Sequence, residues 1–282
     1  MGRHSEESDA SVDTDTDALD SKKTPTRSAE ADAFWEKVGV EPVEIALPKG
    51  VGLTLRAYRM SDTVEPTVVD RDEEDADPEP IDVRDEEDDS DERGEDDDDL
   101  DFSDDLDDDD DEDEDDEEPE PEEIPVFLSH RGTLPLFETA AALVAHIRSD
   151  APHDLRSIDT WDELVEGIKP EYVVAAEDDS YELDLVVRNL RGGHDTWDPE
   201  LLISAGELAR DLGYALRLPT VITTLSPDSP LDELDNALRG MVDGGLRAMF
   251  ARRRVRRIGA QQTALAWRGI INKIGESVDW RN

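Results

Sequence analysis

The chain has 282 residues and carries 77 acidic against 29 basic side chains, a formal net charge of −48 at pH 7. It contains no cysteine, which excludes disulfides, thiolate metal sites and cysteine nucleophiles. No apolar run approaches the roughly 20 residues of a membrane-spanning helix, and the first residues lack the apolar core of a signal peptide. These features predict a protein of the cytoplasm, and the excess of arginine over lysine is typical of a high-GC bacterial genome.

Most of the negative charge lies in one segment. Residues 61–123 hold 40 acidic and 3 basic residues, a local net charge of −37. Such a composition cannot bury enough apolar surface to offset the entropy lost on ordering the chain. We therefore predict a disordered polyacidic loop over residues 61–123. Residues 1–28 are rich in Ser, Asp and Thr, and they predict a disordered tail for the same reason.

The stretch of residues 29–60 predicts the first part of a folded domain. AEADAFWEKVGV has the apolar spacing of a short helix, and VEIALPKGVGLTLRAYRM then alternates on both sides of a Pro-Lys-Gly turn. This pattern is typical of a β-hairpin, with strands near residues 43–47 and 51–59.

Residues 124–190 predict the second part of the same domain. Arg131-Gly132 separates two apolar strand candidates, and Thr139 can cap the helix that follows them. A capping box at Thr160 opens another short helix. Residues 171–187 then alternate in the manner of a further hairpin, which turns at the acidic residues after Ala176.

Residues 191–282 predict a helical C-terminal part that ends in a basic helix. Asp198-Pro199 and Ser229-Pro230 each combine an N-cap with proline at the first helical position. The second of these pairs opens one long predicted helix with an apolar seam formed by Leu231, Leu234, Leu238, Val242, Leu246 and Met249. A last helix presents Leu265, Trp267, Ile270, Ile271 and Ile274.

The predicted fold class is α+β, with an antiparallel hairpin-based sheet, flanking helices and a helical C-terminal part. Hairpin candidates stand on both sides of the acidic run, and a single two-stranded hairpin is marginal on its own. We therefore expect residues 51–59 and 126–130 to share one sheet, with the long disordered polyacidic insert leaving and re-entering it.

Catalytic motifs are missing from the sequence. It has no HExxH, GxSxG, P-loop or dinucleotide fingerprint, and no histidine has a second ligand at metal spacing, so no metal or cofactor is expected. The loop NLRGGHDTWD is the one alternative, because His194 beside Asp195 and Arg191 can serve as a general base. A solvated loop explains the same residues, and the sequence favours a non-enzymatic protein.

The polyacidic run has three interpretations. It is a solubilising loop, a nucleic-acid mimic that presents dense negative charge to a basic groove of a partner protein, or a lid over the chain's own basic helix. Three apolar residues interrupt the charge and are candidate partner anchors: Leu100, Phe102 and Leu106.

The run of arginines near the C-terminus carries the opposite charge to the polyacidic segment. On a helix its five arginines spread around more than half of the circumference, so this turn is predicted to project from the core. We expect an anion-binding or nucleic-acid-binding surface formed by Arg252, Arg253, Arg254, Arg256 and Arg257. A cationic helix end that stabilises the helix dipole is the simpler alternative.

Several segments resemble a family of acidic actinobacterial proteins of unknown function, some of which are labelled primosomal proteins. The segments are LPLFETAAALVAHIRS, HDLRSIDTWDEL, YELDLVVRNL and TWDPELLISAGELARDLGYAL, within about residues 125–240. This resemblance implies association with replication proteins and DNA, and it transfers no functional residue. Together with the charge pattern, it predicts a non-enzymatic interaction protein of the bacterial cytoplasm that acts by charge on nucleic-acid-handling machinery, with a basic-surfaced protein as the expected partner and no membrane.

Overall fold

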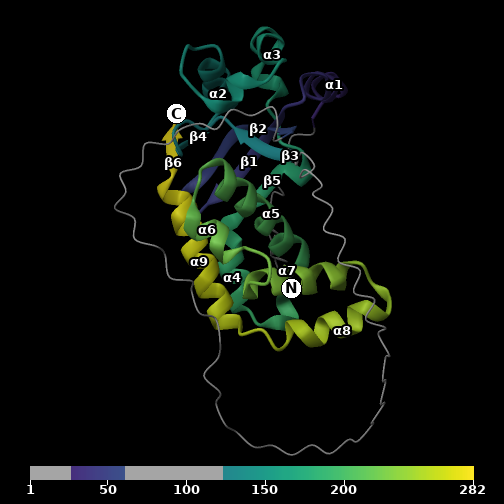
Figure 1. Ribbon diagram of the computed structural model, residues 1–282. Helices are drawn as coiled ribbons and strands as arrows, with labels where there is room; N and C mark the ends of the chain where they lie inside the picture. The colour runs from purple at the N-terminus through teal and green to yellow at the C-terminus, as the bar shows by residue number, and fades with distance from the viewer. Residues whose placement is uncertain (1–26, 61–122) are drawn as a thin grey trace, which may run out of the picture.

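The computed structural model describes residues 27–60 and 123–282 (Figure 1). The tail predicted for residues 1–28 and the loop predicted for residues 61–123 therefore lie almost entirely outside the described residues. The same holds for the candidate anchors Leu100, Phe102 and Leu106.

Helices make up most of the described chain. The α-helices are α1 (Ala29–Val38), α2 (Ala140–Ile147), α3 (Trp161–Gly167), α4 (Leu183–Arg191), α5 (Pro199–Ala215), α6 (Pro219–Thr224), α7 (Pro230–Val242), α8 (Gly245–Val255) and α9 (Ala260–Glu276). Short 3-10 turns are η2 (Asp154–Ser157), η3 (Pro170–Tyr172), η4 (Glu177–Asp179) and η5 (His194–Thr196). The strands are β1 (Glu41–Leu47), β2 (Gly50–Met60), β3 (Glu123–Phe127), β4 (Leu134–Phe137), β5 (Ser180–Glu182) and β6 (Val278–Arg281).

The strands form one mixed six-stranded sheet with the order β5-β1-β2-β4-β6, and β3 also pairs with β2. The pairs β1–β2, β2–β3 and β2–β4 are antiparallel, as the sequence predicts, whereas β1–β5 and β4–β6 are parallel. The prediction of a purely antiparallel sheet is therefore wrong at its two edges. Both edge strands follow long, mainly helical connections, and such connections can return a strand in the parallel direction.

The acidic segment starts and ends at neighbouring positions of this sheet. Met60, the last residue of β2, pairs with Glu123, the first residue of β3. The expectation that strands before and after the segment share one sheet is confirmed. The β1–β2 hairpin is confirmed as well, with Leu47 paired to Gly50 across its turn.

The predicted hairpin between β3 and β4 is different in the structure. Both strands lie antiparallel to β2 along the edge opposite β1. An isolated bridge between His130 and Thr133 joins the segments between them. The strand β2 extends past the end of β3, so that β3 pairs with one part of β2 and Phe137 of β4 pairs with Leu53 in another part.

The sheet separates two hydrophobic cores. Val43, Ile45 and Leu47 of β1 pack with α4, α5, α6, α7 and α9, whereas Leu55 and Ala57 of β2 pack with α1, α2 and α3. Figure 1 shows the sheet between the small group of helices α1–α3 and the larger helical layer. The chain therefore has three layers, an α+β arrangement with a helical C-terminal region.

Local signals placed most helices correctly. Side chains of Ser28, Thr139, Asp198 and Ser229 accept backbone N–H groups at the starts of α1, α2, α5 and α7. The capping box at Thr160 is wrong, because its Oγ1 donates to the carbonyl oxygen of Val38 instead, at 2.6 Å. This hydrogen bond ties the start of α3 to the end of α1.

The predicted hairpin over residues 171–187 is also wrong. The structure has η3, η4 and the three-residue strand β5 there, followed by helix α4. Leu183, Val186 and Leu190 are buried at helical spacing, and they face the larger core. Over so short a stretch the alternating and helical patterns share residues, and packing against α9 decides between them.

Shortening the acidic segment tests this arrangement. Because Met60 and Glu123 are register partners, we expect removal of residues 64–120, with a short Gly-Ser linker, to leave the melting temperature unchanged or higher. The loop-closure entropy saved is about 2 kcal/mol at most. Thermal unfolding followed by circular dichroism measures the effect, with a Gly-Ser linker of the native length as the control for loop length. Loss of cooperative unfolding in the shortened chain would contradict the single sheet.

Candidate interaction surface

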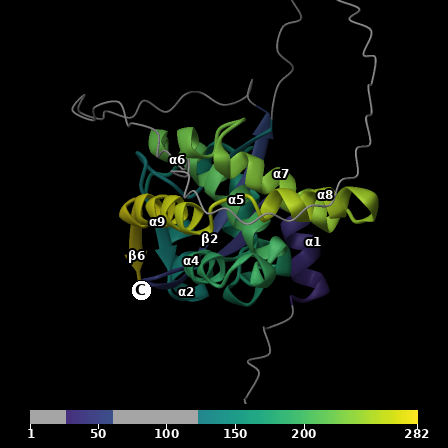
Figure 2. The ribbon, with the colours of Figure 1, turned by 90° about the horizontal axis from the view of Figure 1, so that it is seen from below.

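Helix α8 carries the basic run, and it is separate from α7. The sequence predicts one long helix here, which is wrong, because Gly244 and Gly245 have φ angles of 79° and 67° and interrupt it. Glycine adopts this left-handed backbone without the steric cost that other residues incur. The interruption lets α8 turn away and project at the edge of the molecule (Figure 2).

Small residues hold α8 against its neighbour. Ala248, Ala251 and Val255 are buried. A Cβ atom at Gly240 of α7 would lie 3.3 Å from the Cβ of Ala251, so the two helices approach closely at this point. Since the buried contact uses small side chains, the larger side chains of α8 are left on its outer faces.

Two large apolar side chains of α8 are exposed. Phe250 is 76% exposed and Met249 is 69% exposed, while Val242, at the end of α7, is 55% exposed. The predicted apolar seam is therefore confirmed for Leu231, Leu234 and Leu238 and wrong for Val242 and Met249, and the side chain of Leu246 is not described. The seam fails where the helix is interrupted.

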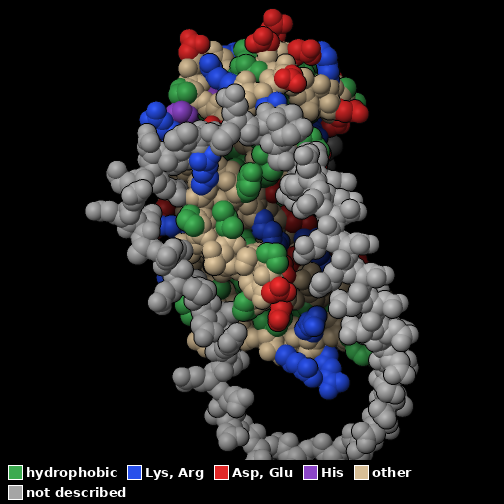
Figure 3. Space-filling model, in the orientation of Figure 1, with side chains coloured by type: hydrophobic (Ala, Val, Ile, Leu, Met, Phe, Trp, Pro, Cys, Tyr) green, Lys and Arg blue, Asp and Glu red, His purple; other side chains and the backbone are tan. Residues whose placement is uncertain are grey.

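All five predicted anion-binding arginines are exposed: Arg252, Arg253, Arg254, Arg256 and Arg257. Arg256 lies 3.4 Å from Asp195, and both side chains are largely in solvent. Within residues 27–60 and 123–282 no ion pair is present at the other four. Figure 3 shows basic side chains gathered at the lower end of the molecule, over α8. We call Met249, Phe250 and these five arginines the α8 surface.

The His194 loop lies directly beside the α8 surface. The Nε2 atom of His194 is 2.8 Å from the carbonyl oxygen of Ile258, and the imidazole packs on Trp197 with ring centroids 4.5 Å apart. The following residue, Asp195, makes the ion pair with Arg256. These contacts attach the C-terminal end of α8 to the main helical layer, so the structure gives His194 a positioning contact that the sequence did not predict.

A buried charged cluster lies between the sheet and α5. Arg56 of β2 is 6% exposed, and its Nη2 atom donates to Asp179 at 2.7 Å. Its Nη1 atom donates to Tyr181 at 3.0 Å and to Asp211 of α5 at 3.2 Å. The hydroxyl of Tyr58 donates to the same oxygen of Asp211 at 2.7 Å. The cluster therefore joins β2, β5 and α5 through one guanidinium group.

The electrostatics of this cluster follow from its burial. The pKa of Asp179 is raised to about 6, chiefly by burial and also by the nearby carboxylate of Glu41, whereas Arg56 opposes both effects. Burial also raises the pKa of Asp211, against the hydrogen bonds from Tyr58 and Arg56. Sequence reasoning missed this cluster, and the available signal was an arginine in the middle of an otherwise apolar strand.

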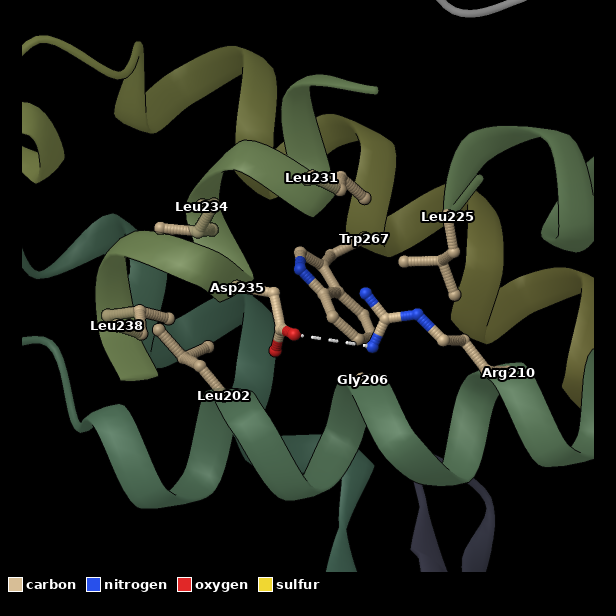
Figure 4. Close-up of a pocket in the computed structure, with 9 residues that line it drawn as sticks. All are labelled: Leu202, Gly206, Arg210, Leu225, Leu231, Leu234, Asp235, Leu238 and Trp267. Atoms are coloured by element: carbon tan, nitrogen blue, oxygen red, sulfur yellow. Dashed lines mark ion pairs between the residues drawn. The ribbon is translucent and has the colours of Figure 1, made fainter. Parts of the chain in front are cut away.

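A small cavity lies among α5, α7 and α9. Figure 4 shows Arg210 and Asp235 pointing toward one another among leucine side chains, beside Trp267. Their ion pair measures 3.5 Å, and Arg239 also donates to Asp235 at 2.9 Å. With a volume of about 10 Å³ the cavity has space for one water molecule and is too small for an organic ligand. We therefore regard it as part of the packing between these helices.

In the described part of the chain, no cluster of three or more His, Cys, Asp or Glu side chains has the geometry of a metal site. No helix in the same residues has the length and apolar character needed to cross a membrane.

Comparison with known proteins identifies the family. The model of the SatS C-terminal domain family matches residues 119–274, more than half of the chain. The chain belongs to this family. A solved structure described as "The crystal structure of SatS c-terminal domain in complex with bromine" matches this SatS-family chain with a TM-score of 0.51 and 19% identity, over 88% of this chain and 97% of the other. At that identity the match shows a shared fold. No curated protein matches the chain.

The resemblance to proteins labelled primosomal is thereby corrected. The segments that suggested it lie within the part matched by the SatS C-terminal domain family. They consist of capped amphipathic helices and short strands, patterns that many unrelated α+β folds share. Such segments indicate secondary structure, and they do not separate one family from another.

Proposed function

We propose that this member of the SatS C-terminal domain family is a non-enzymatic interaction protein of the bacterial cytoplasm whose α8 surface binds acidic polypeptide segments that carry apolar side chains. The observation that carries the proposal is the exposure of Phe250 and Met249 beside five exposed arginines. The proposal keeps the prediction that the protein acts by charge on nucleic-acid-handling machinery. It adds that the bound segment is acidic and carries apolar side chains.

The composition of the α8 surface supports a protein partner. Arginine, methionine and aromatic residues are enriched at protein interfaces, and a small number of such residues usually supplies most of the binding energy. Exposed arginines increase the rate of encounter with an acidic partner, and apolar side chains then add short-range contacts. Phe250 and Met249 are the residues that would give the surface selectivity.

The chain itself contains a segment with this chemistry. Residues 61–123 are strongly acidic, and Leu100, Phe102 and Leu106 interrupt their charge. A tethered segment reaches an effective concentration in the millimolar range when its span fits, so we propose that it competes with outside ligands for the α8 surface. Attraction between exposed charges weakens above about 0.15 M salt, where the screening length is near 8 Å.

In this proposal the His194 loop has a structural role. Because a carbonyl oxygen only accepts, Nε2 of His194 donates to the carbonyl oxygen of Ile258, and the imidazole packs on Trp197. These contacts fit a residue that positions the C-terminal end of α8.

A labelled peptide of residues 95–118 tests the α8 surface. We expect it to bind a chain that lacks residues 64–120, and to bind the full-length chain more weakly because the tethered segment competes. Replacing Arg252, Arg253 and Arg254 by alanine should weaken binding about ten-fold or more. Fluorescence anisotropy at low and moderate salt measures both effects.

Matched variants separate specific binding from general charge. Exposed basic residues elsewhere provide a charge-matched control. We expect the triple change Lys37→Ala, Arg188→Ala and Arg268→Ala to leave peptide binding nearly unchanged. A peptide with serine at Leu100, Phe102 and Leu106 should bind more weakly than the native one. If the shortened chain does not bind the native peptide, the proposal is wrong.

Nucleic acid is the second candidate ligand, favoured by the number of exposed arginines. Binding to the phosphates of a duplex depends on cations, whereas single-stranded bases can also stack on an aromatic side chain such as Phe250. With labelled duplex DNA as the probe, the double change Met249→Ser and Phe250→Ser therefore distinguishes the two ligands. It should weaken peptide binding strongly, whereas binding to the duplex would persist if nucleic acid were the ligand.

A further inference from the structure

An open cleft lies at the opposite end of the molecule from the α8 surface. Its volume is about 400 Å³, and it lies between the turn around Arg131, the helix residue His146 and the strand residues Asp279 and Arg281. Sites for small organic molecules usually have volumes of about 300–1,000 Å³. Figure 3 shows histidine next to basic side chains near the corner where β6 ends.

Basic groups predominate in the cleft. His130, Arg131, His146 and Arg281 line it together with one carboxylate, that of Asp279. Arg281 donates through Nε to Asp279 at 2.8 Å, and its Nη1 atom lies 3.4 Å from Nδ1 of His146. Because arginine has no acceptor, Nδ1 of His146 is the acceptor, and the neutral ring carries its proton on Nε2.

A second histidine, His153, lies next to His146, and its ring nitrogens make no hydrogen bond to the described residues. His153 is 6% exposed, its ring centroid is 5.9 Å from that of His146, and neither of its nitrogens has a hydrogen-bond partner among the described residues. Burial lowers the pKa of His153 to about 4, with His146, Arg156 and His130 adding to the effect. Unpartnered buried polar groups are uncommon because each one lowers stability.

The turn that carries Arg131 has an unusual sequence. Arg131 and Gly132 have φ angles of 50° and 74°, and His130 and Thr133 exchange both backbone hydrogen bonds across them, at 2.9 and 3.1 Å. This is a two-residue turn in which asparagine or aspartate normally precedes glycine. An arginine is less suited to that backbone, so its presence is better explained by its side chain at the cleft.

We propose that this cleft binds a small organic oxyanion, held by Arg131, Arg281 and His146. The guanidinium groups match the geometry of carboxylate and phosphate groups, which accept two parallel hydrogen bonds. An anion there also compensates the crowding of basic groups around His146. The apolar parts of the cleft, at Leu128 and Pro135, suit the organic portion of such a ligand.

Binding is expected to involve proton uptake. Burial lowers the pKa of His146, Arg281 and Arg156 lower it further, and Asp279 opposes them. The other titratable side chains close to this pair of histidines are those of His153 itself and His130. A bound anion favours the protonated form of His146, so the pKa of His146 rises in the complex. The affinity for the anion should therefore increase as the pH falls toward the pKa that His146 has in the free protein.

Phenyl phosphate and benzoate, which differ in the anionic group, are the probes. We expect saturable binding of at least one of them to the full chain by isothermal titration calorimetry, with a Kd of roughly 1 mM or lower. The stronger of the two identifies the anionic group that the cleft prefers. Benzoate stays ionised near neutral pH, so its affinity reports on the protonation of the protein.

The variant Arg131→Asn is the sharpest test, because asparagine suits the turn and removes the guanidinium. We expect it to weaken binding about ten-fold or more, since it removes hydrogen bonds to a charged ligand, while the melting temperature stays the same or rises. His146→Gln should abolish the pH dependence, and Arg188→Gln on α4 is the control for net charge. Absence of saturable binding by both probes, or equal binding by Arg131→Asn, would overturn the proposal. The result is independent of the proposed function, because the α8 surface lies elsewhere and its proposed ligand is a polypeptide.

Discussion

Replacing Arg56 by alanine is expected to lower the free energy of unfolding by about 3–5 kcal/mol. The change leaves the carboxylates of Asp179 and Asp211 buried without their cation, 2.7 and 3.2 Å from where the guanidinium nitrogens had been. An uncompensated buried charge is far more costly than the loss of an exposed pair. Urea denaturation followed by tryptophan fluorescence measures the loss.

Two companion variants show that the effect comes from buried charge. Arg59, three residues further along β2, bonds to Ser157 at the surface, and its replacement by alanine should cost about 1 kcal/mol or less. The triple change Arg56→Met, Asp179→Asn and Asp211→Asn should be less destabilising than Arg56→Ala, because it leaves no buried charge unpaired. Equal losses for Arg56→Ala and Arg59→Ala would show that the cluster contributes little.

A second large effect is expected in the pH dependence of stability. The pKa of Asp179 is about 6 in the folded chain against an ordinary value of 3.8, so the folded state binds this proton more tightly than the unfolded state. The stabilisation is complete below about pH 4 and is lost as pH rises to about 6. A difference of roughly two pKa units corresponds to about 3 kcal/mol.

His153 has the opposite dependence over the same range. The pKa of His153 is about 4 in the folded chain against an ordinary value of 6.5, so its stabilising contribution is present above the unfolded pKa and is lost as pH falls. The two effects oppose each other in the native chain. We therefore compare the native chain with Asp179→Asn by urea denaturation at several pH values. The native chain should lose stability relative to this variant between about pH 4 and 6, and a constant difference would contradict the assignment.

Local sequence signals predicted the elements that short-range physics controls. The caps at Thr139, Asp198 and Ser229 and the β1–β2 hairpin depend on residues close together in the chain, and all are present. The exposed arginines of α8 were also predictable, because they surround the helix and cannot all face a core.

Features that depend on distant residues were not predictable. The partners of Arg56 are Asp179 and Asp211, and no local pattern links residues so far apart. The parallel edge strands depend on the path of the intervening helices. The exposure of Met249, which the sequence placed in the apolar seam, follows from the interruption at Gly244 and Gly245.

The pairing of β6 with β4 has a consequence for how the chain reaches its folded state. Leu134 pairs with Val278, and nearly the whole helical region lies between them in the chain. The sheet also joins β2 to β3 across the acidic segment, and it joins β1 to β5 across a stretch of chain that includes β2, β3, β4, α2 and α3. Folding rates fall as contacting residues become more distant in sequence, because the ends of each loop must meet before the contact is formed. We expect folding on the millisecond-to-second scale typical of such topologies, with the helices forming before the sheet closes at β6.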